Sequence, residues 1–157
     1  MNTIAYHRAT NDDVELLVKY RTLFSTELLG PQLPEVEVEL QEQLRTYFGT
    51  AIADNSCIGY FAKSGDDIAG VGQIIIRSQP GNFKNISGKV GYLMNMYTVP
   101  AYRNKGICFG LINKLIDEAR TCGVKAFELH ATKMGEGVYK KAGFEIHPEP
   151  TFRKYIK

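Results

Sequence analysis

The segment 97–110 places the strongest constraint on the fold, because its pattern is that of a strand entering a helix through a short loop. The loop carries two cations and a glycine, Arg103, Lys105 and Gly106. The first amides of a helix have no partner within the helix and carry partial positive charge, and a glycine lets the backbone close around a phosphate. The segment therefore predicts an anion site at the start of a helix.

Two familiar phosphate-binding patterns do not fit this loop. The sequence has no GxxxxGK[ST], and the stretch from Gly106 to Gly110 does not have the spacing of GxGxxG. The competing interpretation is that Gly106 is an ordinary loop residue and that Arg103 and Lys105 are solvated charges. The loop by itself leaves both interpretations open.

Helical and strand periods alternate along the rest of the chain, which predicts a mixed α/β sheet of order βααβββαβαββ. After a first short strand, the predicted elements are helices over 12–29 and 34–48, strands over 56–63, 67–77 and 90–99, a helix from Gly106 to Gly123, a strand over 126–131, a helix over 137–142, and strands over 144–147 and 152–156. No linker or repeat interrupts this order, so we expect one domain over residues 1–157.

Composition excludes several classes of function. The chain is 44% hydrophobic and 23% charged, and it has no apolar run long enough to span a membrane. The 19 basic residues exceed the 17 acidic residues by only two, which does not favour nucleic-acid binding. Its start has no leader pattern. We therefore expect a cytoplasmic protein that has neither nucleic acid nor membrane as a partner.

The cysteines give no sign of a disulfide framework or a metal site. Cys57, Cys108 and Cys122 are odd in number, and they have no CxxC spacing or nearby histidine cluster. We expect buried free thiols and no metal.

The strand, the run Val-x-Pro-x-Tyr-Arg-x-Lys-Gly-Ile and the following helix together resemble the signature of the GNAT acetyltransferases. The family pattern in the loop is Arg/Gln-x-x-Gly-x-Gly/Ala, which Arg103 and Gly106 match, while Cys108 stands where Gly or Ala is usual. A second segment, 138–144, looks like the family element Leu-Tyr-x-Lys-x-Gly-Phe. The resemblance covers about residues 56–147 and is weaker over the first two helices.

This resemblance implies the GNAT fold, a mostly antiparallel mixed sheet flanked by about four helices, and an N-acetyltransferase that uses acetyl-CoA as co-substrate. It implies binding of the pantetheine arm by the end of the strand and of the phosphates by the loop. The implied coenzyme-binding residues are Met96, Tyr97, Thr98, Val99, Arg103, Asn104, Lys105, Gly106, Ile107 and Cys108.

Acetyl transfer to an amine needs a neutral amine, a polarised thioester carbonyl and a proton for the departing thiolate. Tyr139 resembles the family tyrosine beside the coenzyme sulfur, and a phenol with a pKa near ~10 is protonated at neutral pH and can donate. We expect Tyr139 to be catalytic; the alternative is a tyrosine that packs on the sheet. A backbone amide, that of Tyr97, is expected to stabilise the oxyanion. As general base, His130 and a bound water both stay open.

Two further questions remain open at this level. The fold can bind coenzyme A without catalysis, as a sensor or scaffold module, and the acyl group can differ from acetyl. The sequence does not identify the amine acceptor. Dimers are common among the proteins that the chain resembles, so the resemblance implies a possible homodimer.

Overall fold

The computed structural model describes residues 3–157, in which five strands form one sheet of order β1-β2-β3-β4-β5. Neighbouring strands are antiparallel except β4 and β5, which are parallel. In chain order the elements are β1 (Ile4–Arg8), α1 (Val14–Leu29), α2 (Pro34–Ala53), β2 (Cys57–Ser64), β3 (Asp67–Ser78), β4 (Lys89–Thr98), α3 (Ile107–Thr121), β5 (Ala126–Glu128) and α4 (Glu136–Lys141). This mixed, mostly antiparallel sheet with four α-helices confirms the predicted fold class.

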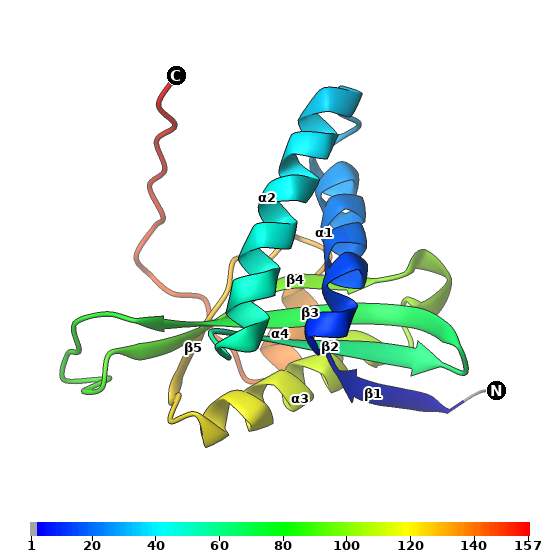
Figure 1. Cartoon of the computed structure of the whole chain (residues 1–157). Helices are drawn as coiled ribbons and strands as arrows, with labels where there is room; N and C mark the ends of the chain where they lie inside the picture. Colours follow the sequence, from blue (N-terminus) through cyan, green and yellow to red (C-terminus); the bar gives the residue numbers. More distant parts are fainter. Residues whose placement is uncertain (1–2) are drawn as a thin grey trace.

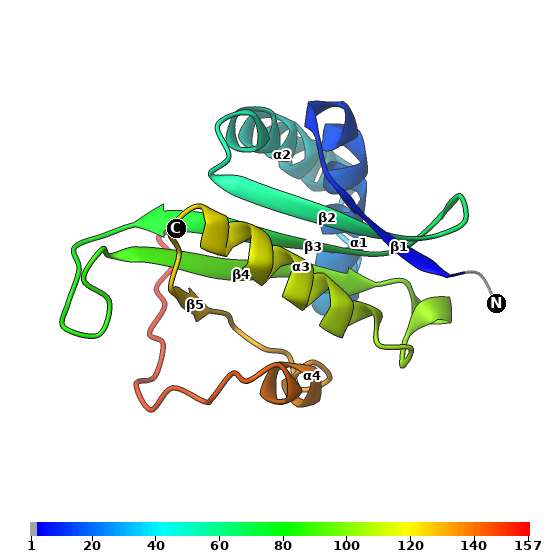
Figure 2. The same cartoon turned by 90° about the horizontal axis from the view of Figure 1, so that it is seen from below.

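The sheet separates two layers of helices. Figure 1 shows α1 and α2 on one face, and Figure 2 shows α3 lying along the opposite face. Because successive side chains of a strand point to opposite faces, neighbours on β2 join different layers. Cys57 and Phe61 pack beneath α1 and α2, whereas Ile58 packs beneath α3.

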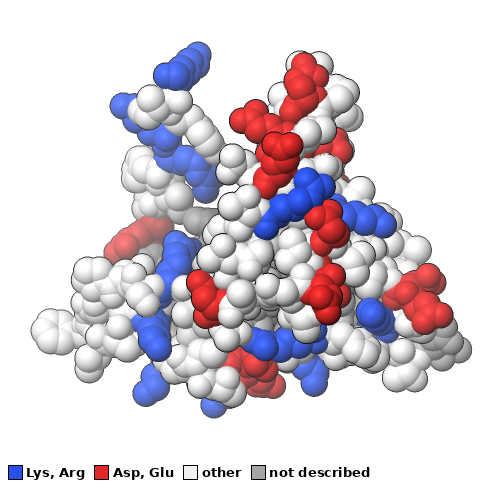
Figure 3. All heavy atoms as spheres, viewed as in Figure 1, with Lys and Arg blue, Asp and Glu red and all other residues white. Residues whose placement is uncertain are grey.

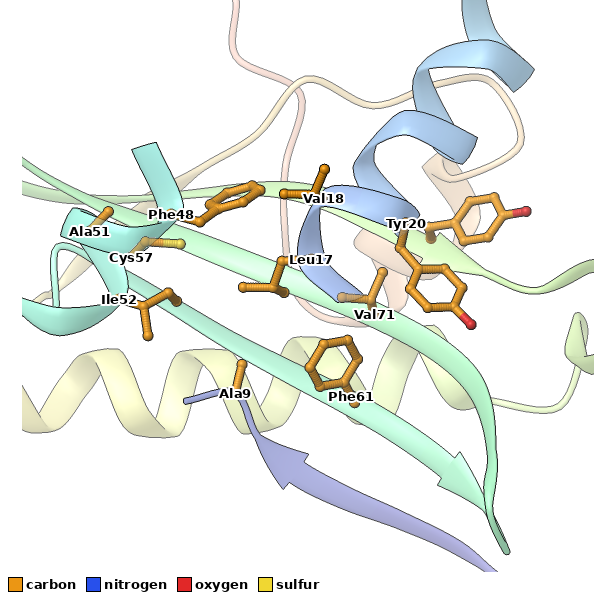
Figure 4. Packing of buried hydrophobic residues seen from close by; sticks show 11 residues of the cluster. Ala9, Leu17, Val18, Tyr20, Phe48, Ala51, Ile52, Cys57, Phe61 and Val71 are labelled. Carbon is orange, nitrogen blue, oxygen red and sulfur yellow. The ribbon is translucent and has the colours of Figure 1, made fainter. Parts of the chain in front are cut away.

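The first helical layer is anchored by a cluster that includes fully buried side chains. Figure 4 shows Leu17 of α1 pointing into this cluster, where Phe48 of α2 and Phe61 of β2 also lie. Each such side chain contributes about 1.5–3 kcal/mol when it leaves water. Burial also explains why α2 continues to Ala53, five residues past its predicted end, since Ala51 and Ile52 belong to the same cluster.

A β-bulge interrupts the ladder between β3 and β4. Opposite Gly72 of β3 stand two residues of β4, Asn95 and Met96. Asn95 adopts a left-handed φ of 53°, and its Nδ2 donates a hydrogen bond to Gln73 Oε1 at 2.6 Å. An extra residue of this kind bends its strand and increases the local twist. The second half of β4 is therefore re-aimed relative to the first.

β4 and β5 pair only over three residues, from Val90 to Tyr92 of β4 and from Ala126 to Glu128 of β5. The strand predicted over 126–131 is thus too long at its end. The bulge at Asn95 turns β4 away, so the residues after Glu128 have no straight edge to follow. One edge of β4 beyond Tyr92 is left without a strand partner.

The two strands predicted over 144–147 and 152–156 are wrong. The Phe144 N–H is used to end α4, where it donates to Tyr139 O at 3.0 Å. Pro148 and Pro150 have no N–H for a ladder, and the chain from residue 145 onward forms an extended arm that leads away from the sheet (Figure 1). No strand of the described chain pairs with the arm, and Phe152 is 91% exposed.

Although the net charge is only +2, acidic and basic side chains gather in separate places on the surface (Figure 3). On the face in Figure 3, acidic side chains gather at the free end of the α1–α2 pair, and basic ones follow the arm. The first group includes Glu35 and Glu39, and the second Arg153 and Lys154, all of them exposed. Among the helices of residues 3–157, none is long and apolar enough to cross a membrane.

Candidate active site

A cleft of about 430 Å³ lies along the free edge of β4, where α1, the loop into α3 and α4 also contribute side chains. This volume is within the usual range for small-ligand sites. Nine of the predicted residues line it: Met96, Tyr97, Thr98, Arg103, Asn104, Gly106, Ile107, Cys108 and Tyr139. Val99 and Lys105 are outside the lining.

The start of α3 presents unpaired backbone amides to this cleft. Gly106 is the N-cap, with a left-handed φ of 76°, and it has no side chain to cap the helix. The first helical hydrogen bond runs from Gly110 N to Gly106 O at 3.0 Å, so the amides of the preceding turn have no helical acceptor. Ile107, Cys108 and Phe109 of that turn all line the cleft. The local geometry is that of an anion site.

Arg103 is half-buried and is held by groups on both sides of the loop. Its Nη2 donates to both carboxylate oxygens of Glu27 at 2.8 Å, and its Nε donates to Thr98 O at 2.9 Å. The hydrogen bond to Glu27 raises the pKa of the guanidinium. Arg103 thus joins the loop to α1, and its charge is already paired.

Only every second residue of β4 can direct its backbone N–H and C=O groups toward the cleft. Val99 donates its N–H to Ala69 O at 2.9 Å, toward β3. Because backbone groups alternate between the two edges of a strand, the Tyr97 N–H faces β3 as well. Thr98 and Met96 therefore turn their backbone groups toward the cleft.

Lys105 extends past the outside of the loop. Its Nζ lies 5.4 Å from the centre of the Tyr102 ring, and the residue is exposed. The ammonium group can therefore add positive charge near the start of α3 without entering the cleft.

Tyr139 combines a partly buried ring with a hydroxyl group that makes no hydrogen bond to residues 3–157. The ring lies edge-on to Phe144, with 6.1 Å between the ring centres. Burial, with a smaller contribution from the neighbouring Cys108, raises the pKa of the phenol. The hydroxyl therefore keeps its proton at neutral pH and can donate it to a ligand in the cleft.

Cys108 is a neutral thiol in this environment, since burial raises its pKa to about 11. The residue takes the place where the resemblance leads one to expect Gly or Ala, and its small side chain is accommodated between the α3 layer and Tyr139. All three cysteines are free, but the expected burial holds only for Cys57, since Cys108 and Cys122 are half-buried.

His130 lines the cleft on its α4 side and is exposed. Its ring lies edge-on to Tyr92, with 5.7 Å between ring centres. No group of three or more His, Cys, Asp or Glu side chains within the described residues is placed to hold a metal ion.

Sequence reasoning missed the wall that α1 contributes. Arg21, Phe24 and Leu28 follow helical spacing on one face and line the cleft together with Glu27. Phe24 and Leu28 appear in the sequence as ordinary core residues. The sequence does contain one sign of this wall: Arg21 is a cation on the same helix face as the apolar residue Leu17.

Comparisons with known proteins agree on the kind of protein. Residues 20–144 match the model of the acetyltransferase (GNAT) family. A predicted acetyltransferase from Clostridium acetobutylicum, solved with acetyl-CoA, is 29% identical with a TM-score of 0.87, covering 97% of this chain and 96% of that one. A GCN5-related N-acetyltransferase from Ralstonia eutropha is 24% identical, with a TM-score of 0.83 and coverage of 97% and 99%, and it shares the fold. No curated protein sequence gives a significant match.

The cleft thiol yields a prediction about pH. Raising the thiol pKa from 9.0 to about 11 lowers the thiolate fraction at pH 8, so we expect iodoacetamide to alkylate Cys108 about 100-fold more slowly in the folded than in the unfolded protein. The rate should rise about tenfold per pH unit toward pH 11. Peptide mass spectrometry measures both, with a urea-unfolded sample as control. Equal rates at pH 8 would contradict the buried, neutral thiol.

Proposed function

Because the chain belongs to the GNAT family of acetyltransferases, we propose that it transfers the acetyl group of acetyl-CoA to a primary amine by direct attack on the thioester. The observation that carries this proposal is the continuity of one cleft. It joins the uncapped start of α3, the free edge of β4 and the Tyr139 hydroxyl. A phosphate site, a pantetheine track and a proton donor thus follow one another in the order that a bound thioester requires.

In this proposal the diphosphate of the coenzyme binds the amides of Ile107 and Cys108, with Asn104, Lys105 and Gly106 around it. Arg103 shapes the loop through its ion pair with Glu27 more than it contacts the anion, because its guanidinium is already neutralised. Backbone amides and the exposed Lys105 then supply the positive potential.

The pantetheine arm lies along the free edge of β4, where the Thr98 N–H and the backbone groups of Met96 face the cleft, the Thr98 carbonyl being held by Arg103. The amine nitrogen attacks the thioester carbon, a C–N bond forms, and the C–S bond breaks. The negative charge that develops on the carbonyl oxygen needs a nearby donor. The Met96 N–H at the bulge replaces the Tyr97 N–H in this role, since the latter faces β3.

Two protons must move during the reaction. Tyr139 donates its phenolic proton to the departing sulfur, and the amine loses a proton to a base. His130 is within the cleft lining and is the side chain proposed for the second step, directly or through a water.

The competing function is a coenzyme A sensor without catalysis. The two differ in one measurement, a screen of amines with acetyl-CoA that monitors release of the free thiol. Release with at least one class of amine supports the enzyme. Tight binding of acetyl-CoA without release over a broad set of amines and peptides supports the sensor.

The extended arm supports a homodimer. It carries the exposed apolar residues Phe152, Tyr155 and Ile156, each more than 80% exposed, and the sheet has an edge at β5. An exposed segment of this kind and an open strand edge are complementary, and two copies related by a two-fold axis can satisfy each other.

For the anion site, we expect Gly106→Asp to weaken acetyl-CoA binding at least tenfold, because the change puts a carboxylate beside the diphosphate. Position 106 has a left-handed φ of 76° but open space around a Cβ, so backbone strain is the only other effect. Gly106→Asn is the control, since Asn has the same shape and tolerates this φ. Calorimetry measures both affinities. Equal binding by the two variants would remove the loop from the phosphate site.

For the proton donor, we expect Tyr139→Phe to bind acetyl-CoA normally and to lower single-turnover rates about 10²- to 10⁴-fold. Only the hydroxyl group is lost, so the ring packing against Phe144 stays. Tyr47→Phe removes a hydroxyl from an exposed position of α2 outside the cleft and serves as control. A Tyr139→Phe variant as fast as the native protein would exclude the phenol from the chemistry.

For the arm, we expect Phe152→Ser to shift the native dimer toward monomer at micromolar concentration, because it removes an apolar contact between copies. Phe83→Ser, at an equally exposed position of the β3–β4 loop, is the control and should not change the assembly. Light scattering coupled to gel filtration measures the mass. A native protein that is monomeric at these concentrations contradicts the proposal.

A further inference from the structure

Arg21 is a cation of the cleft that the proposed chemistry does not use. It lies on α1, three residues before Phe24 and seven before Leu28, so these three side chains share the helix face that lines the cleft. Arg21 is half-buried there. Tyr92, whose charge acts on Arg21, and Met94 of β4 line the same cleft.

The carboxylate in the cleft lining, Glu27, and Glu128, which lies opposite Tyr92 in the β4–β5 ladder, are both already paired with other cations. Glu27 holds Arg103 at 2.8 Å, and Glu128 holds Arg77 at 3.1 Å. Arg77 also covers the ring of Tyr92, at 4.2 Å from its centre. Across residues 3–157, Arg21 takes part in no ion pair and its side chain makes no hydrogen bond.

Arg21 is a half-buried guanidinium that has no partner among residues 3–157. Burial lowers the pKa of Arg21, and Tyr92 opposes this in part, yet a guanidinium stays protonated in proteins. Its charge is partly desolvated and has no ion-pair partner among residues 3–157, so an anion in the cleft can gain from pairing with it. The planar fork of an arginine fits a carboxylate with two parallel hydrogen bonds.

We propose that the acceptor amine carries a carboxylate, which binds Arg21 and directs the amino group toward the thioester beside Tyr139. This inference rests on the proposed acetyl transfer and specifies its substrate class. One unneutralised cation matches a single negative charge. The apolar neighbours Phe24, Leu28 and Met94 favour an amino acid with an apolar side chain. Cationic polyamines are disfavoured, because their further charges would face Arg21.

The test compares acceptors with and without a carboxylate, with kcat/KM expressed per concentration of neutral amine, because the carboxylate also raises the pKa of the neighbouring amino group. Leucine, methionine and phenylalanine are each assayed beside their carboxamides, with 2-aminoethyl phosphate and spermidine as further probes. We expect the acids to exceed their amides in kcat/KM by about 10- to 100-fold. Calorimetry with coenzyme A and the corresponding N-acetyl amino acids gives a binding readout that does not depend on turnover, and the same preference is expected there.

The variant Arg21→Gln should abolish this preference by raising KM for the acids, with acetyl-CoA affinity unchanged. Arg21→Lys should restore part of it, since it keeps the charge without the fork. The control Lys19→Gln removes a cation from α1 outside the cleft lining and should behave as the native protein.

Each outcome decides a separate point. Amides that bind and react as well as the acids overturn the inference and leave the acetyltransferase intact. A preference for the phosphate or for spermidine overturns the choice of a carboxylate. Acids and N-acetyl acids that bind no better than their amides overturn it as well. Failure of the native protein to bind acetyl-CoA contradicts instead the proposed function.

Discussion

The bulge at Asn95 and Met96 is the constraint on which the cleft depends. It places two residues of β4 opposite Gly72, and the re-aimed strand leaves β5 after three paired residues. The part of β4 that follows Tyr92 has no partner strand on that edge, and it forms one wall of the cleft. Keeping this bend requires a left-handed backbone at a non-glycine residue and buries Asn95 Oδ1 without a hydrogen-bond partner in the described chain. A buried unpaired acceptor costs about 1–3 kcal/mol, so packing elsewhere must offset it.

The helical layer above the sheet supplies that packing and the second wall of the cleft. Leu17 fixes α1 to the sheet, and one turn later the same helix presents Arg21 to the cleft. The contact between α1 and the coenzyme loop is polar, through Glu27 and Arg103. Apolar packing of Leu17 and the ion pair between Glu27 and Arg103 therefore hold α1 in place. The helix borders both the coenzyme loop and the part of the cleft that contains Arg21.

How far the sequence allowed prediction follows from the range of each interaction. The strand, loop and helix around Gly106 were predictable because their signals are local: free helix amides, a glycine with φ of 76°, and apolar residues at helical spacing. The strands predicted at 144–147 and 152–156 are wrong, since a strand needs a partner and periodicity does not reveal whether one is present. The pairing of Arg103 with Glu27 joins residues 76 apart in the chain, so the loop alone suggested a free cation. For Arg21, the sequence showed only a cation on an apolar helix face and not its place in the cleft.

Glu27 and Arg103 close the boundary between the coenzyme loop and the wall formed by α1. A ligand that draws Arg103 away also frees Glu27, and a ligand that engages Glu27 loosens Arg103. Thermodynamic linkage makes such an effect reciprocal. If a first ligand changes the affinity for a second by some factor, the second changes the affinity for the first by the same factor. Any coupling that this ion pair carries between occupants of the two regions is therefore a single free energy, the same in both directions. The total free energy of binding both ligands is the same whichever of them binds first.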